Sequence, residues 1–454
     1  MSVISGNYQD TENFAGALKV FYAAKMIQTL NRDVVLRNRL KNMGKKKWTG
    51  LQHETSVNLG SSQAVGARPE GGYIPDAGSN TYAKAVISSK YNYCTVSVTG
   101  VADARSGGKG AWAKVKAEAV QQSAEDLAFD LGRQCYGSPE GFLGQVANEP
   151  SGSTDSAAAD ITITLTGEGD TLGTGTAPEY TWRTSKNFRV GMPVVYGDLS
   201  GDYFGASSPV GRGYGTIKSV ADDGAFVTIV VTVPKLVDEP EQYDVFVRGN
   251  DSAAGKHAYN NEMNGLTNIV DDGSKYASLH GISSADHAGW AAKVFQNPSS
   301  AGTKRPLTEQ LLQHAIDKIK TRSNGKPDLA ICHTSVRNAF VFHLKDQGRE
   351  RFAPMKMQGG WSTLTYNAGD RPLDIVADRQ ARHHRLYLLD TRYIHNYEVL
   401  PFAWDQANGS TWKWVSGRDE MIAFGKTYGE LGTTNRGAHG VIEDIAVSSF
   451  GHFE

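Results

Sequence analysis

The chain has 454 residues, more than one hydrophobic core normally organises, so we expect about two to four domains. Its 47 Lys and Arg residues balance 48 Asp and Glu residues, which excludes attraction of nucleic acid or membrane by bulk charge. The odd, widely spaced cysteines predict free thiols in a reducing compartment: Cys94, Cys135 and Cys332. Without a signal peptide or an apolar run of about 18 residues, we expect a soluble protein made inside the cell.

Residues 1–50 are predicted to form an N-terminal arm with one helix between about Leu18 and Leu30. A segment rich in Lys and Arg follows, and it supplies a candidate basic patch: Arg37, Arg39, Lys41, Lys45, Lys46 and Lys47. Such a patch would suit nucleic acid or an acidic neighbour only if several of its cations converge on one surface. The alternative is a solvated, charged flank.

Residues 51–100 are extended, polar and interrupted by glycines. Two β-rich runs flank a tip at residues 68–78, which holds two prolines and three glycines. The alternation of Tyr91, Tyr93, Thr95 and Ser97 favours a strand over a disordered insertion. Because a two-stranded hairpin is only marginally stable in water, we expect this ribbon to lie on another copy of the chain.

The stretch from Gly110 to Gly137 predicts an amphipathic helix of about 26 residues. Its apolar residues recur every three or four positions on one stripe: Ala113, Ala117, Val120, Ala124, Leu127 and Leu131. We expect this alanine-rich stripe to be buried against a sheet. The opposite side, which includes Gln121, is expected to meet solvent or another subunit. The alternative is the seam of a coiled coil, but the stripe lasts fewer than the roughly three or four complete heptads that such a seam needs.

Short β runs broken by Gly, Asp and Asn at intervals of about ten residues fill residues 158–250 and predict an inserted small β-barrel or sandwich. Residues 251–454 predict a mixed α+β region. An amphipathic helix is expected with apolar residues from Leu307 to Ile319, cations up to Arg322 in its last turn and Gly325 just past its end. A helix opening at Thr334 or Ser335 is expected to follow a buried strand that starts at Leu329. Further strands are expected at 373–376, 386–389 and 393–400.

Common catalytic motifs are absent from the sequence, with no Walker sequence, nucleophile elbow or HExxH. His383 and His384 are adjacent, and on a strand they would point to opposite faces and could not chelate one metal together. Asp271, Asp272 and Gly273 fit a turn better than a calcium loop. We therefore expect no enzyme, no cofactor and no metal site.

Seven segments in a fixed order carry a resemblance: VGARPEGGYIPDAG (65–78), KYNYCTVSVTG (90–100), EDLAFDLGRQCYG (125–137), NEMNGLTNIV (261–270), KPDLAICHTSVRNAF (326–340), RLYLLDTRYIH (385–395) and GELGTTNRGAHGVI (429–442). Together they resemble the major capsid proteins of tailed bacteriophages, which have the Hong Kong-type, or HK97-like, shell fold. The resemblance covers residues 45–145 and 260–445.

The resemblance implies an α+β chain with an N-terminal arm (1–50), an extended hairpin called the E-loop (51–100), a P-domain with a long spine helix (101–157), the inserted β domain (158–250) and the rest of the P-domain with the A-domain (251–454). The helix predicted above would be the spine. The E-loop tip would contact a neighbouring subunit through Arg68, Glu70, Gly71, Gly72, Tyr73 and Asp76. Neither Lys84 nor Lys90 lies in a motif that matches the cross-linking lysine of some relatives.

The implied function is a major capsid protein that assembles itself into hexamers and pentamers of an icosahedral head around double-stranded DNA, with no sequence-specific binding and no membrane. The basic patch would then face the interior. Expected partners are a separate scaffolding protein, a portal and a decoration protein, and the expected location is the virion, assembled in the bacterial cytoplasm. An encapsulin shell is one alternative. The other is a glycan-active enzyme or binding module, suggested by the Gly-rich β insertion and by Trp361, Trp404, Trp412 and Trp414.

Overall fold

The computed structural model describes residues 35–43, 45–62, 64–106, 115–148, 150, 158–165, 185–199, 203–204, 210–222, 227–235, 237–298, 303–346, 364–367, 369, 371–406 and 410–447. The described residues divide into two compact units. The smaller unit comprises the described parts of 94–126 and 404–424, and the larger comprises the described parts of 33–93, 127–403 and 425–454. The predicted helix near Leu18 to Leu30 lies outside the described residues, and so do Ala113 and Trp361.

A mixed six-stranded sheet forms the C-terminal core of the larger unit, in the order β13-β21-β17-β14-β16-β15. Its strands are β13 (Lys293–Phe295), β14 (Leu329–Cys332), β15 (Leu364–Asn367), β16 (Pro372–Ala377), β17 (Leu386–Leu389) and β21 (Gly440–Ile442). Strand β14 pairs in parallel with β16 and antiparallel with β17. Every residue of β14 and β17 is buried, as in central strands covered on both faces. The strand predicted at 386–389 is confirmed at both ends.

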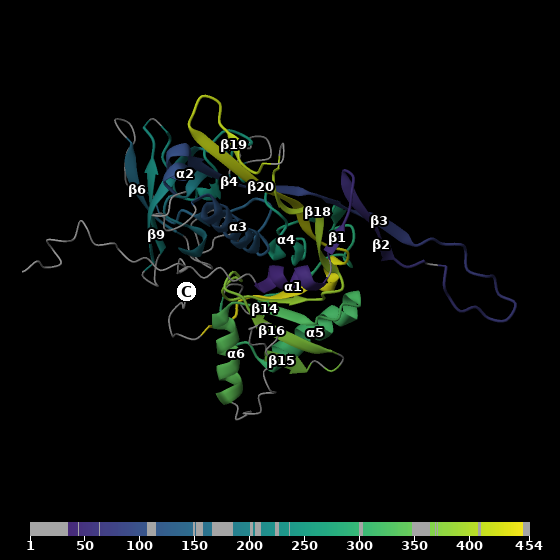
Figure 1. Ribbon diagram of the computed structural model, residues 1–454. Helices are drawn as coiled ribbons and strands as arrows, with labels where there is room; N and C mark the ends of the chain where they lie inside the picture. The colour runs from purple at the N-terminus through teal and green to yellow at the C-terminus, as the bar shows by residue number, and fades with distance from the viewer. Residues whose placement is uncertain are drawn as a thin grey trace, which may run out of the picture. The chain divides into compact units, whose positions relative to one another are not determined.

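Helices α5 (Glu309–Ser323) and α6 (Thr334–Asp346) lie beside this sheet (Figure 1). The hydroxyl of Thr308 caps α5 by accepting a hydrogen bond from the Leu311 N–H at 3.2 Å. Asn324 ends the helix in the left-handed region at φ 55°. The apolar face of α5 is buried in the core, as its spacing predicts, through Leu312, Ala315, Ile316 and Ile319.

The inserted β domain is a small closed barrel within the larger unit. Its strands are β5 (Gly144–Gln145), β6 (Ala159–Thr164), β7 (Pro193–Gly197), β8 (Gly213–Asp222), β9 (Val227–Val233) and β10 (Val245–Arg248). They run in the order β5-β10-β7-β8-β9-β6. A bridge between Val146 and Leu165 closes the ring, together with a hydrogen bond from the Ala147 N–H to the Thr164 carbonyl at 2.8 Å. Alternate residues of β9 are fully buried, so the barrel has its own packed core.

The barrel corrects the boundary predicted at residue 158. Gly144 and Gln145 pair with Phe246 and Val245, so the chain enters the barrel before the predicted start. Leu143 and Val146 also belong to its core. The sequence conceals this strand because it is only two residues long and has no alternating pattern of its own.

A further sheet contains β1 (Lys45–Lys47), β18 (Ile394–Trp404), β20 (Glu420–Thr433) and β19 (Lys413–Trp414) in the order β1-β18-β20-β19, and β4 (Lys90–Thr99) also pairs with β20. The second arm of the predicted ribbon is therefore two strands. Strand β3 (Thr81–Ser88) pairs with β2 (Gln52–Gly60), whereas β4 leaves the ribbon after Ser89. Val96 and Val98 of β4 are buried, as expected of a strand that pairs within a larger sheet.

The remaining elements are α1 (Val35–Met43), α2 (Gly100–Ser106), α3 (Val115–Gln134), α4 (Leu266–Ile269), β11 (Ser278–Leu279), β12 (Ile282–Ser283) and the 3-10 turns η1 (Ser185–Asn187) and η2 (Arg436–Ala438). Among the described residues, no helix has both the length and the apolar character needed to cross a membrane.

Candidate functional site

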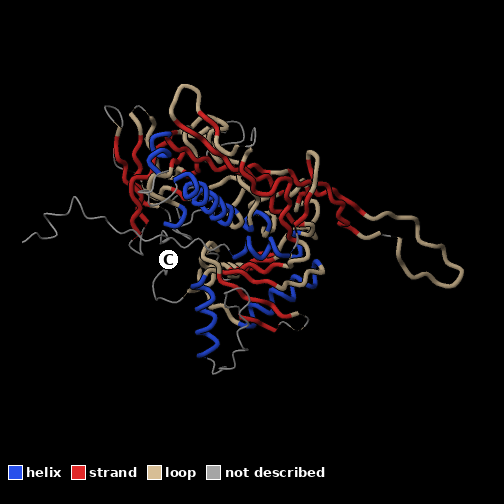
Figure 2. The backbone as a smooth tube through the Cα atoms, in the orientation of Figure 1, coloured by secondary structure: helices blue, strands red, loops and turns tan. Residues whose placement is uncertain are grey.

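The ribbon, defined as β2, β3 and the connecting residues 61–80, extends away from the other elements of its unit (Figure 2). Strands β2 and β3 are paired along almost their whole length, from Gln52 opposite Ser88 to Gly60 opposite Thr81. Ala85 packs against Ile282 and Trp290, and the Val86 N–H donates to the His280 carbonyl at 2.8 Å. Val57, Leu59 and Ala83 also pack against this cluster, so the strands are anchored while most residues of the tip beyond them are exposed.

The tip of the ribbon exposes apolar side chains to an unusual degree. Tyr73 is 94% exposed, and Val65 and Ile74 are each 87% exposed. A turn closed by the Gly72 N–H and the Pro69 carbonyl, at 2.9 Å, presents them, with Gly71 at φ 76°. The six predicted tip residues, Arg68, Glu70, Gly71, Gly72, Tyr73 and Asp76, are all exposed in this region. Large apolar side chains grouped at an exposed tip mark a surface that another molecule covers.

The spine helix α3 is buried over only part of the predicted stripe. Leu127 and Leu131 are buried, while Val120 and Ala124 are half-buried. The expectation that Ala117 is buried is wrong for the single chain, because Ala117 is exposed. Residues up to 126 belong to the smaller unit, and the described residues of that unit leave Ala117 uncovered. From Leu131 to Tyr136 every residue is buried, so that end of the helix lies in the core on all sides.

A buried ionic cluster fixes the C-terminal end of α3. The Arg133 guanidinium lies between Asp130, at 3.0 Å from Nε to Oδ1, and Glu262, while Arg248 Nη1 lies 3.4 Å from Asp130 Oδ1. Burial alone would raise the pKa of Asp130, but Arg248 and Arg133 outweigh it and hold that pKa well below its usual range. Burial raises the pKa of Glu262 despite Arg133. Since Arg248 belongs to β10, the cluster joins the barrel to the spine.

This cluster was not predicted from the sequence. Its residues are 129 positions apart for Arg133 and Glu262, and no local pattern links them. A signal was nevertheless present, because Asp130 and Arg133 are charged residues within an otherwise apolar end of the helix. Charged groups so placed are rarely buried unless they are paired.

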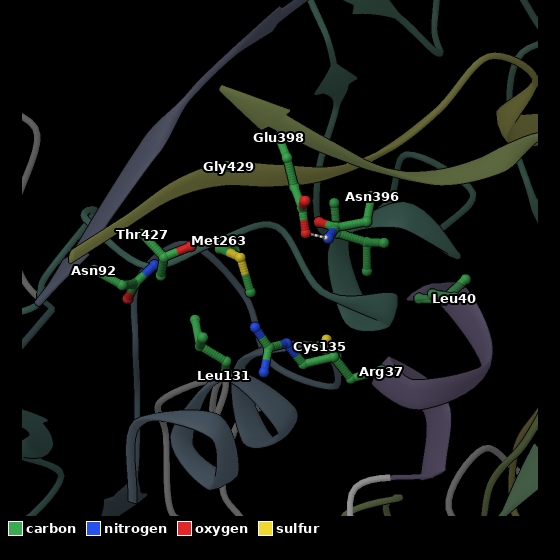
Figure 3. A pocket seen from close by; sticks show the side chains of 11 residues that line it. Arg37, Leu40, Asn92, Leu131, Cys135, Met263, Asn396, Glu398, Thr427 and Gly429 are labelled. Carbon is green, nitrogen blue, oxygen red and sulfur yellow. Dashed lines mark hydrogen bonds between the residues drawn. The ribbon is translucent and has the colours of Figure 1, made fainter. Parts of the chain in front are cut away.

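Among the described members of the predicted basic patch, Arg37 turns inward. Arg37 points into a small cavity of about 20 Å³, which has room for about one water molecule (Figure 3). Burial lowers its pKa, although Cys135 and Glu398 partly offset this. Arg39 lies 3.7 Å from Asp374, and Lys46 lies over the Tyr397 ring at 5.6 Å. The cavity takes Arg37 away from a shared phosphate-binding surface, while the side chains of Lys41 and Lys45 lie outside what the structure describes.

The histidines give no evidence of a metal centre. His383 and His384 lie in a loop rather than on a strand, with His384 at φ 60°. The His383 and His333 rings are 3.9 Å apart, but the Lys186 ammonium lies 3.2 Å from His333 Nε2, and a positive charge there opposes a second cation. The described residues contain no group of three potential metal ligands. Asp271 and Gly273 form a turn, as predicted, with the Gly273 N–H donating to Asp271 at 2.9 Å.

The comparisons with known proteins agree with this architecture. Residues 244–446 match the family model described as SU10 major capsid protein. A capsid subunit of cyanophage A-1(L) is similar in structure, with a TM-score of 0.53 and 11% identity over 95% of this chain and 98% of that chain. An encapsulin from Synechococcus elongatus gives a TM-score of 0.47 and 8% identity over 98% and 99% of the two chains. The capsid of Myoviridae phage XM1 gives 0.44 and 7% over 97% and 100%. No curated protein matches the sequence.

The structure has the HK97-like fold that shell-forming proteins share. Within this fold, residues 244–446 match the family model of a major capsid protein. These findings confirm the predicted resemblance to tailed-bacteriophage major capsid proteins, and they support the formation of a capsid shell.

Proposed function

We propose that copies of the chain assemble into hexamers and pentamers, which form an icosahedral head around double-stranded phage DNA. In this proposal the ribbon is the E-loop, which joins neighbouring subunits. The observation that carries this proposal is the ribbon itself, which is anchored at its base and bears exposed Val65, Tyr73 and Ile74 at its tip. A contact between one patch and a different patch on the next copy generates a ring when the rotation closes. Five or six copies around such a ring would form the capsomers.

The proposal includes the partners that a growing head requires. A separate scaffolding protein would guide curvature, a portal would occupy one vertex, and a decoration protein would bind the outer surface. Assembly would take place in the bacterial cytoplasm before the shell becomes part of the virion. The chain would catalyse no reaction, since the ribbon, the spine and the barrel supply contacts and packing rather than a reactive site. DNA would be enclosed without specific recognition, which fits a chain with 47 positive and 48 negative side chains.

Deletion of the tip tests the ribbon's role. A variant lacking Ala64 to Asn80 keeps both ribbon strands and every contact of Ala85, so we expect a folded, soluble subunit with an unchanged melting temperature. It should not form closed particles, as measured by sedimentation and electron microscopy beside the full-length chain. Closed particles from the deleted chain would refute the proposal that the ribbon joins subunits.

A further inference from the structure

A groove lies beside the base of the ribbon in the larger unit. It has a volume of about 480 Å³, within the range of sites that enclose a small ligand or a few side chains. Strand β2 lines it from Thr55 to Leu59, and the other lining residues are Gly289, Trp290, Arg322, Ser323, Tyr393, Thr434 and Asn435. Strand β2 pairs only with β3 in a two-stranded sheet, so its other edge faces this groove.

An open strand edge is a template for another extended segment, because its backbone N–H and carbonyl groups can pair with that segment. The groove also offers apolar contacts through Val57, Leu59 and Trp290. Among the described residues that line it, Arg322 alone is charged, and it is exposed. A suitable occupant is therefore extended, carries apolar side chains and has a negative charge to place against the guanidinium.

The tip of the ribbon has these three properties. Residues 64–78 contain no helix or strand, and Val65, Tyr73 and Ile74 are almost fully exposed. Glu70 and Asp76 outnumber Arg68, so the tip carries one net negative charge against the positive charge of the groove. The tip points away from its own unit (Figure 2), so the tip that fills the groove of one copy belongs to a second copy.

We propose that the tip of one copy binds in the groove at the base of the next copy's ribbon, where it extends the edge of β2. Tip and groove are different patches, so the contact is head-to-tail and can repeat around a closed ring. This inference rests on the proposed function, since it names the receiving surface for the ribbon of a neighbouring subunit.

Disulfide trapping in assembled full-length protein tests the contact. The variant Tyr73→Cys/Ser56→Cys places one thiol at the tip and one in the groove, and its control, Tyr73→Cys/Gln52→Cys, places the second on β2 outside the groove lining. Mild oxidation should give a ladder of linked copies with the first pair, at least about tenfold stronger than with the control pair or with Tyr73→Cys alone. An equal ladder, no ladder, or a link within one chain would overturn the proposal.

Filling the groove gives an independent test if the cysteine variants do not assemble. Ser56→Trp should leave the melting temperature of the subunit unchanged and reduce particle yield by at least about tenfold, whereas Gln52→Trp should assemble normally. Equal yields from the two variants would refute the groove as the receiving site. The proposed function fails separately, when the unmodified chain forms no closed particles or when the chain lacking Ala64 to Asn80 still forms them.

Discussion

Arg436 shows how one buried charge can hold several loops in place. Its side chain is fully buried and donates to the carbonyls of Asn268, Ile269 and Tyr276 at 3.0 to 3.3 Å, with Asp271 as its carboxylate partner. A guanidinium suits this position because its five N–H donors spread in one plane. The residue follows β20, so it connects that strand to the segment after the barrel.

Replacing Arg436 with Met should destabilise the subunit by about 3 to 5 kcal/mol, since the three carbonyls would lose the guanidinium donor and the buried Asp271 carboxylate would lose its opposite charge. Chemical denaturation measures the change. The control is Arg418→Met, because Arg418 is exposed and its loss should change the free energy of unfolding by less than about 0.5 kcal/mol. Equal effects would show that the hydrogen bonds around Arg436 do not stabilise the fold.

Glu430 predicts a dependence of stability on pH. Its buried carboxyl accepts hydrogen bonds from the Asn264 N–H at 2.6 Å and the Leu431 N–H at 3.0 Å. Burial raises its pKa to about 8, although these donors and Lys90 oppose the shift. The folded state therefore favours the neutral carboxyl, and the unfolded state releases the proton near pH 4.3, roughly the value of a free Glu. Stability from this group is present at low pH and declines as pH rises toward 8.

The variant Glu430→Gln keeps an acceptor oxygen and removes the titration. It should be no more stable than the unmodified chain at low pH, and more stable by on the order of 2 to 4 kcal/mol at about pH 8. Thermal melts across this range give the difference. Glu70→Gln, at the exposed tip, is the matched control and should leave the melts unchanged. A Glu430→Gln effect that does not change with pH would contradict the assigned cause.

Among the elements, the spine helix now has a defined buried end. Leu131 is 2% exposed, so Leu131→Ala should cost about 2 to 5 kcal/mol of unfolding free energy. Gln121→Ala, on an exposed position of the same helix, should cost less than about 0.5 kcal/mol. Denaturant unfolding of both variants measures the contrast. A larger effect at Gln121 would mean that the assignment of buried and exposed positions is wrong.

The barrel makes a second prediction at this scale. Its first and last strands are neighbours, with Gln145 opposite Val245, so its two ends are close enough for a short link. Replacing residues 144–247 with a Gly-Ser linker keeps Arg248 beside Asp130 and should leave a folded core with a cooperative melt. Excising only 158–250 should be more damaging, because Gly144, Gln145 and Val146 would remain in the chain without their barrel partners. A more stable core after excision of 158–250 than after replacement of 144–247 would contradict the barrel boundary at Gly144.

Sequence patterns predicted those helices and strands whose ends and buried faces are set by residues near one another in the chain. Helix α5 has a capping threonine, a regular apolar spacing and a left-handed final residue, and β9 alternates strictly between buried and half-buried residues. Strand β5 and the end of the ribbon at Ser88 depend on partners far away in the sequence. No periodicity within these short segments indicates which strand they pair with, and so the sequence placed both boundaries wrongly.

For the whole molecule, the order of seven segments predicted the HK97-like fold, which the structural similarity confirms. The assembly surfaces were harder to predict. Arg37 and Arg39 are basic in sequence, yet one faces a cavity and the other an aspartate, because burial and pairing are set by distant residues. Ala117 belongs to an apolar stripe, yet it is exposed in the single chain. In an assembled shell, other copies of the chain would cover Ala117 and Tyr73.

Electron cryo-microscopy of the particles formed by the full-length chain is the most direct test of the account. We expect closed icosahedral shells in which each ribbon lies across a neighbouring subunit, with Val65, Tyr73 and Ile74 covered by that neighbour. Particles in which every ribbon folds back onto its own subunit, or a purified chain that forms no closed shell, would contradict it.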